Sequence, residues 1–249
     1  MEREKQIEND VLDFVDNIKS LTTLDALINS FETLIGKYGY QSFRCAEILR
    51  KNQPIDPKNA FGELGADWSV RYREQEYVHI DSSIQLSLQT RYPFTWGALR
   101  ENRRISSLAE KIFIEAENDF RYGDGLLVPI HMADGSVSVV SIIGEKPETD
   151  AEIVRGLGMA AMFLHSEARP LILSDEEVSS RKFSAPISQR QLDCIQWVAE
   201  GKSDWEISKI LGISEATVHN HVERAKRSLG VNTRVQAVVE AARRRLILL

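Results

Sequence analysis

The chain has 249 residues, of which 43% are hydrophobic and 27% charged, a composition typical of soluble globular proteins and long enough for two ordinary domains. No apolar run approaches the roughly 18–20 residues that span a bilayer, and the charged N-terminus lacks a secretory apolar segment, so we expect a cytoplasmic protein that does not contact a membrane. Its two cysteines are too few for a four-ligand zinc site. We expect no metal and no cofactor.

Charge is distributed unevenly along the chain. The formal net charge of −6 combines −8 over residues 1–173, −1 over 174–185 and +3 over 186–249. The stretch SDEEVSSRKFSAP, at 174–186, is polar and has no core periodicity, which is typical of a linker. We therefore predict two domains with different partners, 1–173 and 187–249, joined by this linker.

The N-terminal part of the first domain begins with helical patterns. Apolar residues recur at helical spacing over 4–19 and over 23–38, and the segment 42–49 is strand-like. These segments predict two amphipathic helices followed by a strand.

A hairpin and a long helix are predicted at the end of the same domain. In GLLVPIHMADGSVSVVSIIG (125–144), two apolar runs flank an Asp134-Gly135 turn signal. Thr149 and Glu152 fit a capping box that opens an apolar helix over 150–167. Strands with helices on both sides in the sequence predict an α+β fold, an α-β-α sandwich around an antiparallel sheet.

All patterns after the linker are helical. Each of four short helices has a residue suited to its N-cap, and a glycine ends each of the first three. The N-cap residues are Ser188, Ser203, Ser214 and Thr233, and the glycines are Gly201, Gly212 and Gly230. The last helix is predicted over 233–247. The second domain is therefore predicted to be an all-α, four-helix domain.

Two of these helices, predicted at 204–211 and 215–228, fit a helix-turn-helix. The second carries Asn and Arg, which suit base edges, and Lys, Arg and a capped N-terminus, which suit phosphates. On this pattern alone, an ordinary helical hairpin with a solvated charged face is the alternative. The candidate DNA-binding residues are Ser214, Thr217, Asn220, His221, Arg224, Lys226 and Arg227.

The two histidines of this helix do not predict a metal site. His219 and His221 are two residues apart, so on a helix their side chains point about 200° apart and cannot share one ion. His221 shares a face with Thr217, and we expect it to pack or to contact phosphate.

Aromatic and acidic residues gather in the middle of the first domain. Trp68, Tyr72, Asp81 and Trp96 supply an apolar wall and one hydrogen-bond acceptor, as a small-ligand pocket requires. The alternative is that the tryptophans belong to the core and Asp81 caps a turn. The sequence has no Walker phosphate loop and no Gly-x-Ser-x-Gly elbow. We expect no enzymatic activity.

The segment ISQRQLDCIQWVAEGKSDWEISKILGISEATVHNHVERAKRSLGVNTRVQAVVEAA, from Ile187, resembles the LuxR-type DNA-binding domain along its full length. It departs from the family at Gln191, where Glu is usual, although Gln also closes a capping box. The resemblance implies that this domain binds double-stranded DNA. The matching residues are Trp197, Ala199, Gly201, Lys202, Glu206, Ile207, Leu211, Ser214, Thr217, Val218, His221, Lys226, Leu229, Gly230, Arg234 and Ala237.

The segment 68–144 resembles the autoinducer-binding domain of quorum-sensing LuxR-type regulators. The family pattern places Tyr four residues after Trp, Asp nine after that Tyr, and a second Trp fifteen after the Asp, and Trp68, Tyr72, Asp81 and Trp96 keep all three spacings. The ligands of that family are N-acyl-homoserine lactones. The sequence departs from the family at Ser82, where Pro is usual, and at Leu64, where Tyr is frequent.

The resemblance implies a role for each matching residue. Trp68 would donate its indole N–H to the lactone carbonyl, and Asp81 would accept the ligand amide N–H. Tyr72 would donate a hydrogen bond to the acyl carbonyl or line the acyl chain of the ligand, and Trp96 would pack on the lactone ring. Further hydrogen-bonding candidates are Ser83 and Ser141.

These observations together predict a quorum-sensing transcription factor. It would bind an N-acyl-homoserine lactone and, as a homodimer, a palindromic operator, with the helices at 150–167 and 233–247 as candidate dimer contacts. RNA polymerase is a further candidate partner. The alternative is an orphan regulator of the same build that responds to a different small molecule or to none.

Overall fold

The structure, a computed structural model, describes residues 2–48, 60–101, 105–132, 136–172, 187–244 and 246–247. The chain divides near residue 173 into two compact units, each described by itself. The linker predicted at 174–186 and the turn predicted at Asp134-Gly135 lie outside the described residues. No helix in the described part of the chain is long and apolar enough to cross a membrane.

An antiparallel five-stranded sheet with the order β2-β1-β5-β4-β3 runs through the first unit. Its strands are β1 (Ser42–Ile48), β2 (Phe61–Glu63), β3 (Phe94–Thr95), β4 (Asp124–His131) and β5 (Val137–Gly144). The predicted strand and hairpin are thereby confirmed. β4 pairs with β5, with Leu127 opposite Ser141, and β1 pairs with the other edge of β5, with Arg44 opposite Ser141. Successive side chains point to opposite faces, so each strand contributes to two helical layers.

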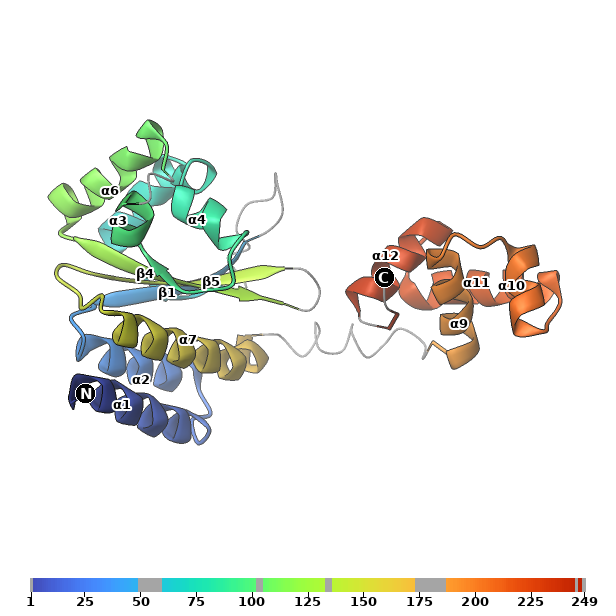
Figure 1. Cartoon of the computed structure of the whole chain (residues 1–249), viewed down its shortest axis with the longest axis horizontal. Coiled ribbons are helices and arrows are strands. Elements are labelled where there is room, and N and C mark those ends of the chain that lie inside the picture. The colour runs from blue at the N-terminus through green and yellow to red at the C-terminus, as the bar shows by residue number, and fades with distance from the viewer. Residues whose placement is uncertain are drawn as a thin grey trace. The chain divides into compact units, whose positions relative to one another are not determined.

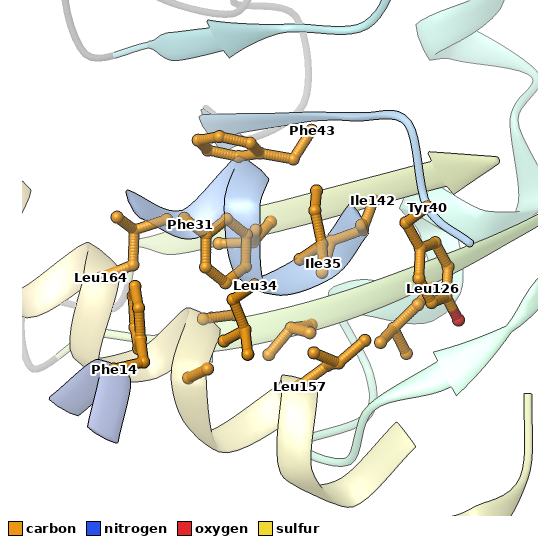
Figure 2. Packing of buried hydrophobic residues seen from close by; sticks show 14 of the residues in the cluster. Phe14, Phe31, Leu34, Ile35, Tyr40, Phe43, Leu126, Ile142, Leu157 and Leu164 are labelled. Carbon is orange, nitrogen blue, oxygen red and sulfur yellow. The ribbon is translucent and has the colours of Figure 1, made fainter. Parts of the chain in front are cut away.

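Three helices, α1 (Glu2–Ile18), α2 (Leu24–Gly36) and α7 (Ala151–Ile172), cover one face of the sheet (Figure 1). They confirm the three long helices predicted from apolar spacing. Figure 2 shows their side chains against those of the sheet, where Phe31 of α2 meets Phe43 of β1 edge-on at 4.8 Å between ring centroids. Each fully buried large apolar side chain in this layer contributes about 1.5–3 kcal/mol through burial.

The predicted start of α7 is wrong by one residue. The backbone N–H of Val154 donates to the carbonyl of Asp150 at 2.9 Å, so the helix begins at Ala151 with Asp150 as its N-cap. Thr149 precedes the cap and cannot close a box with Glu152. Asp is as good an N-cap as Thr, and the adjacent pair of capping residues made the sequence signal ambiguous by one position.

A second helical layer covers the opposite face, which confirms the α-β-α sandwich (Figure 1). Its core includes Trp68, Trp96, Phe113, Leu127 and Ile143. The elements of this layer are α3 (Ala66–Glu74), the 3₁₀ turn η2 (Tyr77–His79), α4 (Ser82–Ser87), α5 (Trp96–Glu101) and α6 (Ser107–Phe120).

The second unit consists of α9 (Gln189–Ala199), α10 (Asp204–Leu211), α11 (Glu215–Leu229) and α12 (Arg234–Arg243), as predicted for an all-α domain. Capping boxes start α9, α10 and α12, and Gly212 and Gly230 end α10 and α11 in the left-handed conformation. The last helix ends at Arg243, short of the predicted residue 247. Val218, Val222 and Leu229 of α11 lie in this unit's own apolar core.

Candidate functional site

The six predicted ligand-binding residues belong to three helices and a strand of the first unit. Trp68 and Tyr72 lie on α3, Asp81 is the N-cap of α4, and Ser83 lies in its first turn. Trp96 begins α5, and Ser141 lies on β5. Four of them, those of α3 and α4, are in contact with one another.

Asp81 is the centre of that group. Its Oδ2 accepts the Tyr72 hydroxyl at 2.8 Å, and its Oδ1 accepts the Ser83 backbone N–H at 2.8 Å and the Ser83 hydroxyl at 2.6 Å. Burial raises the pKa of Asp81, while the hydrogen bonds from Ser83 and Tyr72 oppose that rise. Burial next to this carboxylate also raises the pKa of Tyr72 well above its ordinary value, so the phenol stays a donor. The capping role considered from the sequence is real, and the same carboxylate also faces Tyr72.

Trp68 lies among aromatic rings. Its indole contacts Tyr72 at 5.9 Å, Phe120 at 5.0 Å and Tyr122 at 6.5 Å between ring centroids, all edge-on. It also meets Tyr77 at 6.2 Å. Edge-on contacts of this kind fix the orientation of the indole.

Trp96 is held in a different part of the layer. Its ring packs edge-on against Phe113 at 5.3 Å and covers Gly125 of β4. A Cβ at Gly125 would lie 2.7 Å from the Trp96 ring, so only glycine fits there. The carboxylate of Asp124 accepts the Gly97 N–H at 3.2 Å and thereby ties the start of α5 to β4. Trp96 therefore faces the sheet rather than Asp81.

Ser141 shares the face of Val139 and Ile143, two residues away on either side, because strand residues alternate. This is the face covered by α3, α4, α5 and α6. A cleft of about 230 Å³ opens at this layer between the start of α3 and the end of α6, lined by Gly65, Trp68, Phe120 and Tyr122 among others.

The sequence did not point to several residues of this layer. Tyr77, Phe120 and Tyr122 surround Trp68, and Glu115 of α6 accepts hydrogen bonds from Arg71 and Tyr77. Ser106 and the helical spacing of apolar residues over 107–120 were a usable signal for α6. The pairing of Glu115 with Arg71 and Tyr77, about forty positions earlier, cannot be predicted from the sequence around any of the three residues.

The predicted DNA-binding residues lie on α11 and its N-cap. Thr217, Asn220, Arg224 and Arg227 follow one another at spacings of three and four, and so form one stripe along the helix. Asn220, Arg224 and Arg227 are exposed, whereas Val218 and Val222 point into the core. Exposed Asn and Arg at this spacing can reach successive base edges or phosphates from one face.

The remaining DNA-binding candidates on α11 and its N-cap are partly buried or already bonded to neighbouring residues. The Ser214 hydroxyl lies 2.7 Å from that of Thr217 and accepts the Thr217 N–H at 3.1 Å, so it caps the helix. The Lys226 ammonium pairs with Glu223 at 2.7 Å, and its side chain is only 17% exposed. His221 is half-buried, and packing or a contact to phosphate stays the prediction for it.

His219 is exposed and lies away from His221. Its Nδ1 is 3.4 Å from a carboxylate oxygen of Asp204 at the start of α10, an electrostatic contact between the two helices. Within the described ranges, no group of three or more His, Cys, Asp or Glu side chains is arranged to hold a metal ion.

Comparisons with known proteins identify both units. Residues 23–168 match the family described as "Autoinducer binding domain", and residues 185–241 match "Bacterial regulatory proteins, luxR family". RpaR of Rhodopseudomonas palustris, an HTH-type quorum sensing-dependent transcriptional regulator, is 29% identical over 92% of this chain and 91% of its own.

Solved structures show the same fold. SdiA of Escherichia coli superposes with a TM-score of 0.71 at 18% identity, over 96% of this chain and 98% of its own. CepR2 of Burkholderia cenocepacia, an N-acylhomoserine lactone dependent LuxR family transcription factor, has a TM-score of 0.51 at 16% identity, over 70% of this chain and 99% of its own. The chain belongs to the LuxR family of transcription regulators with an autoinducer-binding domain, a family that is not enzymatic.

Proposed function

We propose that the chain is a quorum-sensing regulator whose first domain, 1–173, binds an N-acyl-homoserine lactone between α3, α4, α5 and the sheet. The observation that carries this proposal is the carboxylate of Asp81, buried among aromatic side chains. Its Oδ2 accepts a hydrogen bond from Tyr72, and a carboxylate oxygen has a second lone pair for an incoming N–H.

The chemistry of an acyl-homoserine lactone suits this group. A neutral amide N–H that enters an apolar site must be paired, because a buried unpaired polar group costs about 1–3 kcal/mol, and a charged acceptor binds more strongly than a neutral one. The fixed indole of Trp68 offers one donor for a carbonyl. The dependence of RpaR on quorum sensing and that of CepR2 on N-acylhomoserine lactones support the same ligand class.

Lactone binding is expected to raise the melting temperature of the full chain. At a ligand concentration a hundredfold above Kd, binding stabilises the folded state by about 2.7 kcal/mol, which corresponds to roughly 5–10 °C for a chain of this size. Differential scanning fluorimetry with a series of N-acyl-homoserine lactones measures this shift, and the ring-opened N-acyl-homoserines are the matched control. Absence of a shift with every acyl chain favours the alternative, an orphan regulator that responds to another small molecule or to none.

The second domain, 187–249, is proposed to bind a palindromic operator as a homodimer, with each α11 in a major groove. Exposed apolar stripes on two helices support pairing: Met159, Met162 and Phe163 on α7, and Val235 and Val239 on α12. Such exposed stripes are typical of surfaces that associate. The DNA-bound dimer would lie in the cytoplasm, where RNA polymerase is a further candidate partner.

Arg224→Ala is expected to weaken operator binding several-fold and, if the guanidinium contacts phosphate, to reduce the slope of log K against log salt by about 1. Arg224 is exposed in the middle of the α11 stripe. Lys226→Ala should have a smaller effect, because Lys226 is paired with Glu223. Fluorescence anisotropy at several salt concentrations measures both variants.

Arg190→Ala is the matched control for this experiment, since Arg190 lies on α9 and its side chain is 60% exposed. The control removes the same charge from the same unit but not from α11. Equal losses in Arg190→Ala and Arg224→Ala would attribute the effect to net charge and contradict the proposed stripe.

A further inference from the structure

Glu115 lies where α6 meets α3 and η2, in the helical layer that carries the proposed ligand residues. We call this junction between α3 and α6 the seam. On one side of the seam is α3, which carries Trp68 and Tyr72. It is followed by η2, which leads directly to Asp81. On the other side is α6, which carries Glu115.

One carboxylate joins these two parts. Glu115 accepts a hydrogen bond from the Arg71 guanidinium of α3 and another from the Tyr77 hydroxyl of η2. Its side chain is 14% exposed. Burial raises the pKa of Glu115, but the bonds from Tyr77 and Arg71 lower it below the ordinary value, so the carboxylate stays ionised at neutral pH. Hydrogen bonds to a charged group are stronger than neutral ones, so the junction is held firmly.

Tyr77 connects this junction to the proposed ligand residues. While its hydroxyl donates to Glu115, its ring packs on Trp68 at 6.2 Å and on Tyr72 at 5.8 Å between centroids. Release of the Tyr77 hydroxyl would therefore free α3 to move away from α6 together with both of these side chains.

The cleft described above opens along the same seam. It is lined by the first residues of α3, including Trp68, and by Asp119 and Phe120 at the end of α6. The residues of the Glu115 junction lie one helical turn from the cleft lining on both helices: Arg71 is about one turn from Trp68 on α3, and Glu115 is one turn from Asp119 on α6. The junction therefore closes the seam directly beyond the cleft. Trp68 is 2% exposed and lies beneath this cleft lining.

We propose that the seam between α3 and α6 is the route by which the ligand enters and leaves, and that Glu115 is a positioning residue that latches it shut. This inference rests on the proposed lactone function and adds the place and control of ligand exchange. The latch bonds of Glu115 join it to Arg71 and Tyr77, neither of which is proposed to bond the lactone, so we expect the same bonds with and without ligand. Their loss therefore destabilises both closed states equally, so association and dissociation become faster by the same factor while Kd stays the same.

Glu115→Gln and Tyr77→Phe test the latch in the full chain. Gln keeps the side-chain volume but loses the charge that holds Arg71, and Phe keeps the ring that packs on Trp68 but loses the hydroxyl. Without ligand, hydrogen exchange of the α3 amides should become roughly fivefold faster in Glu115→Gln and less so in Tyr77→Phe, while exchange in α1, α2 and α7 is unchanged. Glu117→Gln is the matched control, because Glu117 is exposed on the same helix.

Stopped-flow binding of N-octanoyl-homoserine lactone, read by tryptophan fluorescence, tests the route. Both rate constants should rise together in Glu115→Gln, with Kd within twofold of the unmodified chain. Unchanged α3 exchange in Glu115→Gln would overturn the latch. Faster exchange with an unchanged association rate, or a weaker Kd at an unchanged association rate, would overturn the route. If the unmodified chain binds no lactone, the proposed function fails, and the exchange experiment still decides the latch.

Discussion

Asp81→Asn is expected to lower the affinity for an N-acyl-homoserine lactone by roughly 10–100-fold, which corresponds to about 1.5–3 kcal/mol for a hydrogen bond to a charged group. The substitution leaves the size of the side chain unchanged but replaces one carboxylate oxygen by an NH₂ donor. If the remaining oxygen keeps the bonds to Ser83 at the start of α4, the NH₂ group takes the place of Oδ2 and faces both the Tyr72 hydroxyl and the ligand N–H with a donor instead of an acceptor. Titration of the purified chain and a reporter gene under its operator measure the loss.

The effect on binding can be separated from the effect on folding at this position. Asn is as good an N-cap as Asp, so α4 should keep its first turn and the melting temperature without ligand should fall little. Asp13→Asn is the control, because Asp13 is exposed on α1, on the opposite face of the sheet. A variant at Asp81 that binds the lactone normally would remove this residue from the proposed site.

Removal of residues 1–173 is expected to leave a folded unit that binds the operator about 100-fold more weakly or worse. The second unit has its own apolar core, with Cys194, Ile195, Ile207 and Val218 fully buried, and every described residue of this core cluster belongs to that unit. Its net charge of +3 over 186–249 gives one copy a modest attraction to DNA. Linking two weak sites raises avidity by about 10²–10⁴.

Circular dichroism and operator binding by anisotropy measure the two parts of that result. Fusion of the truncated chain to a parallel dimeric coiled coil should restore most of the affinity, because it supplies pairing without a ligand domain. Truncated protein that binds as tightly as the full chain would show that the first domain does not contribute through pairing.

Local patterns predicted the second unit well because each of its helices has a start signal within one turn. The N-caps predicted at Ser188, Ser203 and Thr233 form, each within a capping box, and apolar residues at helical spacing point inward. The same kind of signal failed at Thr149, where the neighbouring Asp150 is an equally good cap and takes the position.

The second helical layer, from α3 to α6, was harder to predict. β2 and β3 are three and two residues long, and α4 and α5 are six each, too short to show a periodicity. The spacing of Trp68, Tyr72, Asp81 and Trp96 identified candidates, but their contacts depend on the fold. Neither the bond between Tyr72 and Asp81 nor the packing of Trp96 on Gly125 follows from spacing alone.

The packing of Trp96 on Gly125 also limits how this receptor can change during evolution. Because any β-carbon at position 125 would collide with the indole, the glycine is fixed for as long as the tryptophan is present. A smaller residue at position 96 would release that restriction and open space over β4, which in the proposed ligand site would admit bulkier signals. If Trp96 belongs to the ligand site as proposed, a change of signal preference is therefore expected to begin at position 96, because position 125 cannot change while the indole is present.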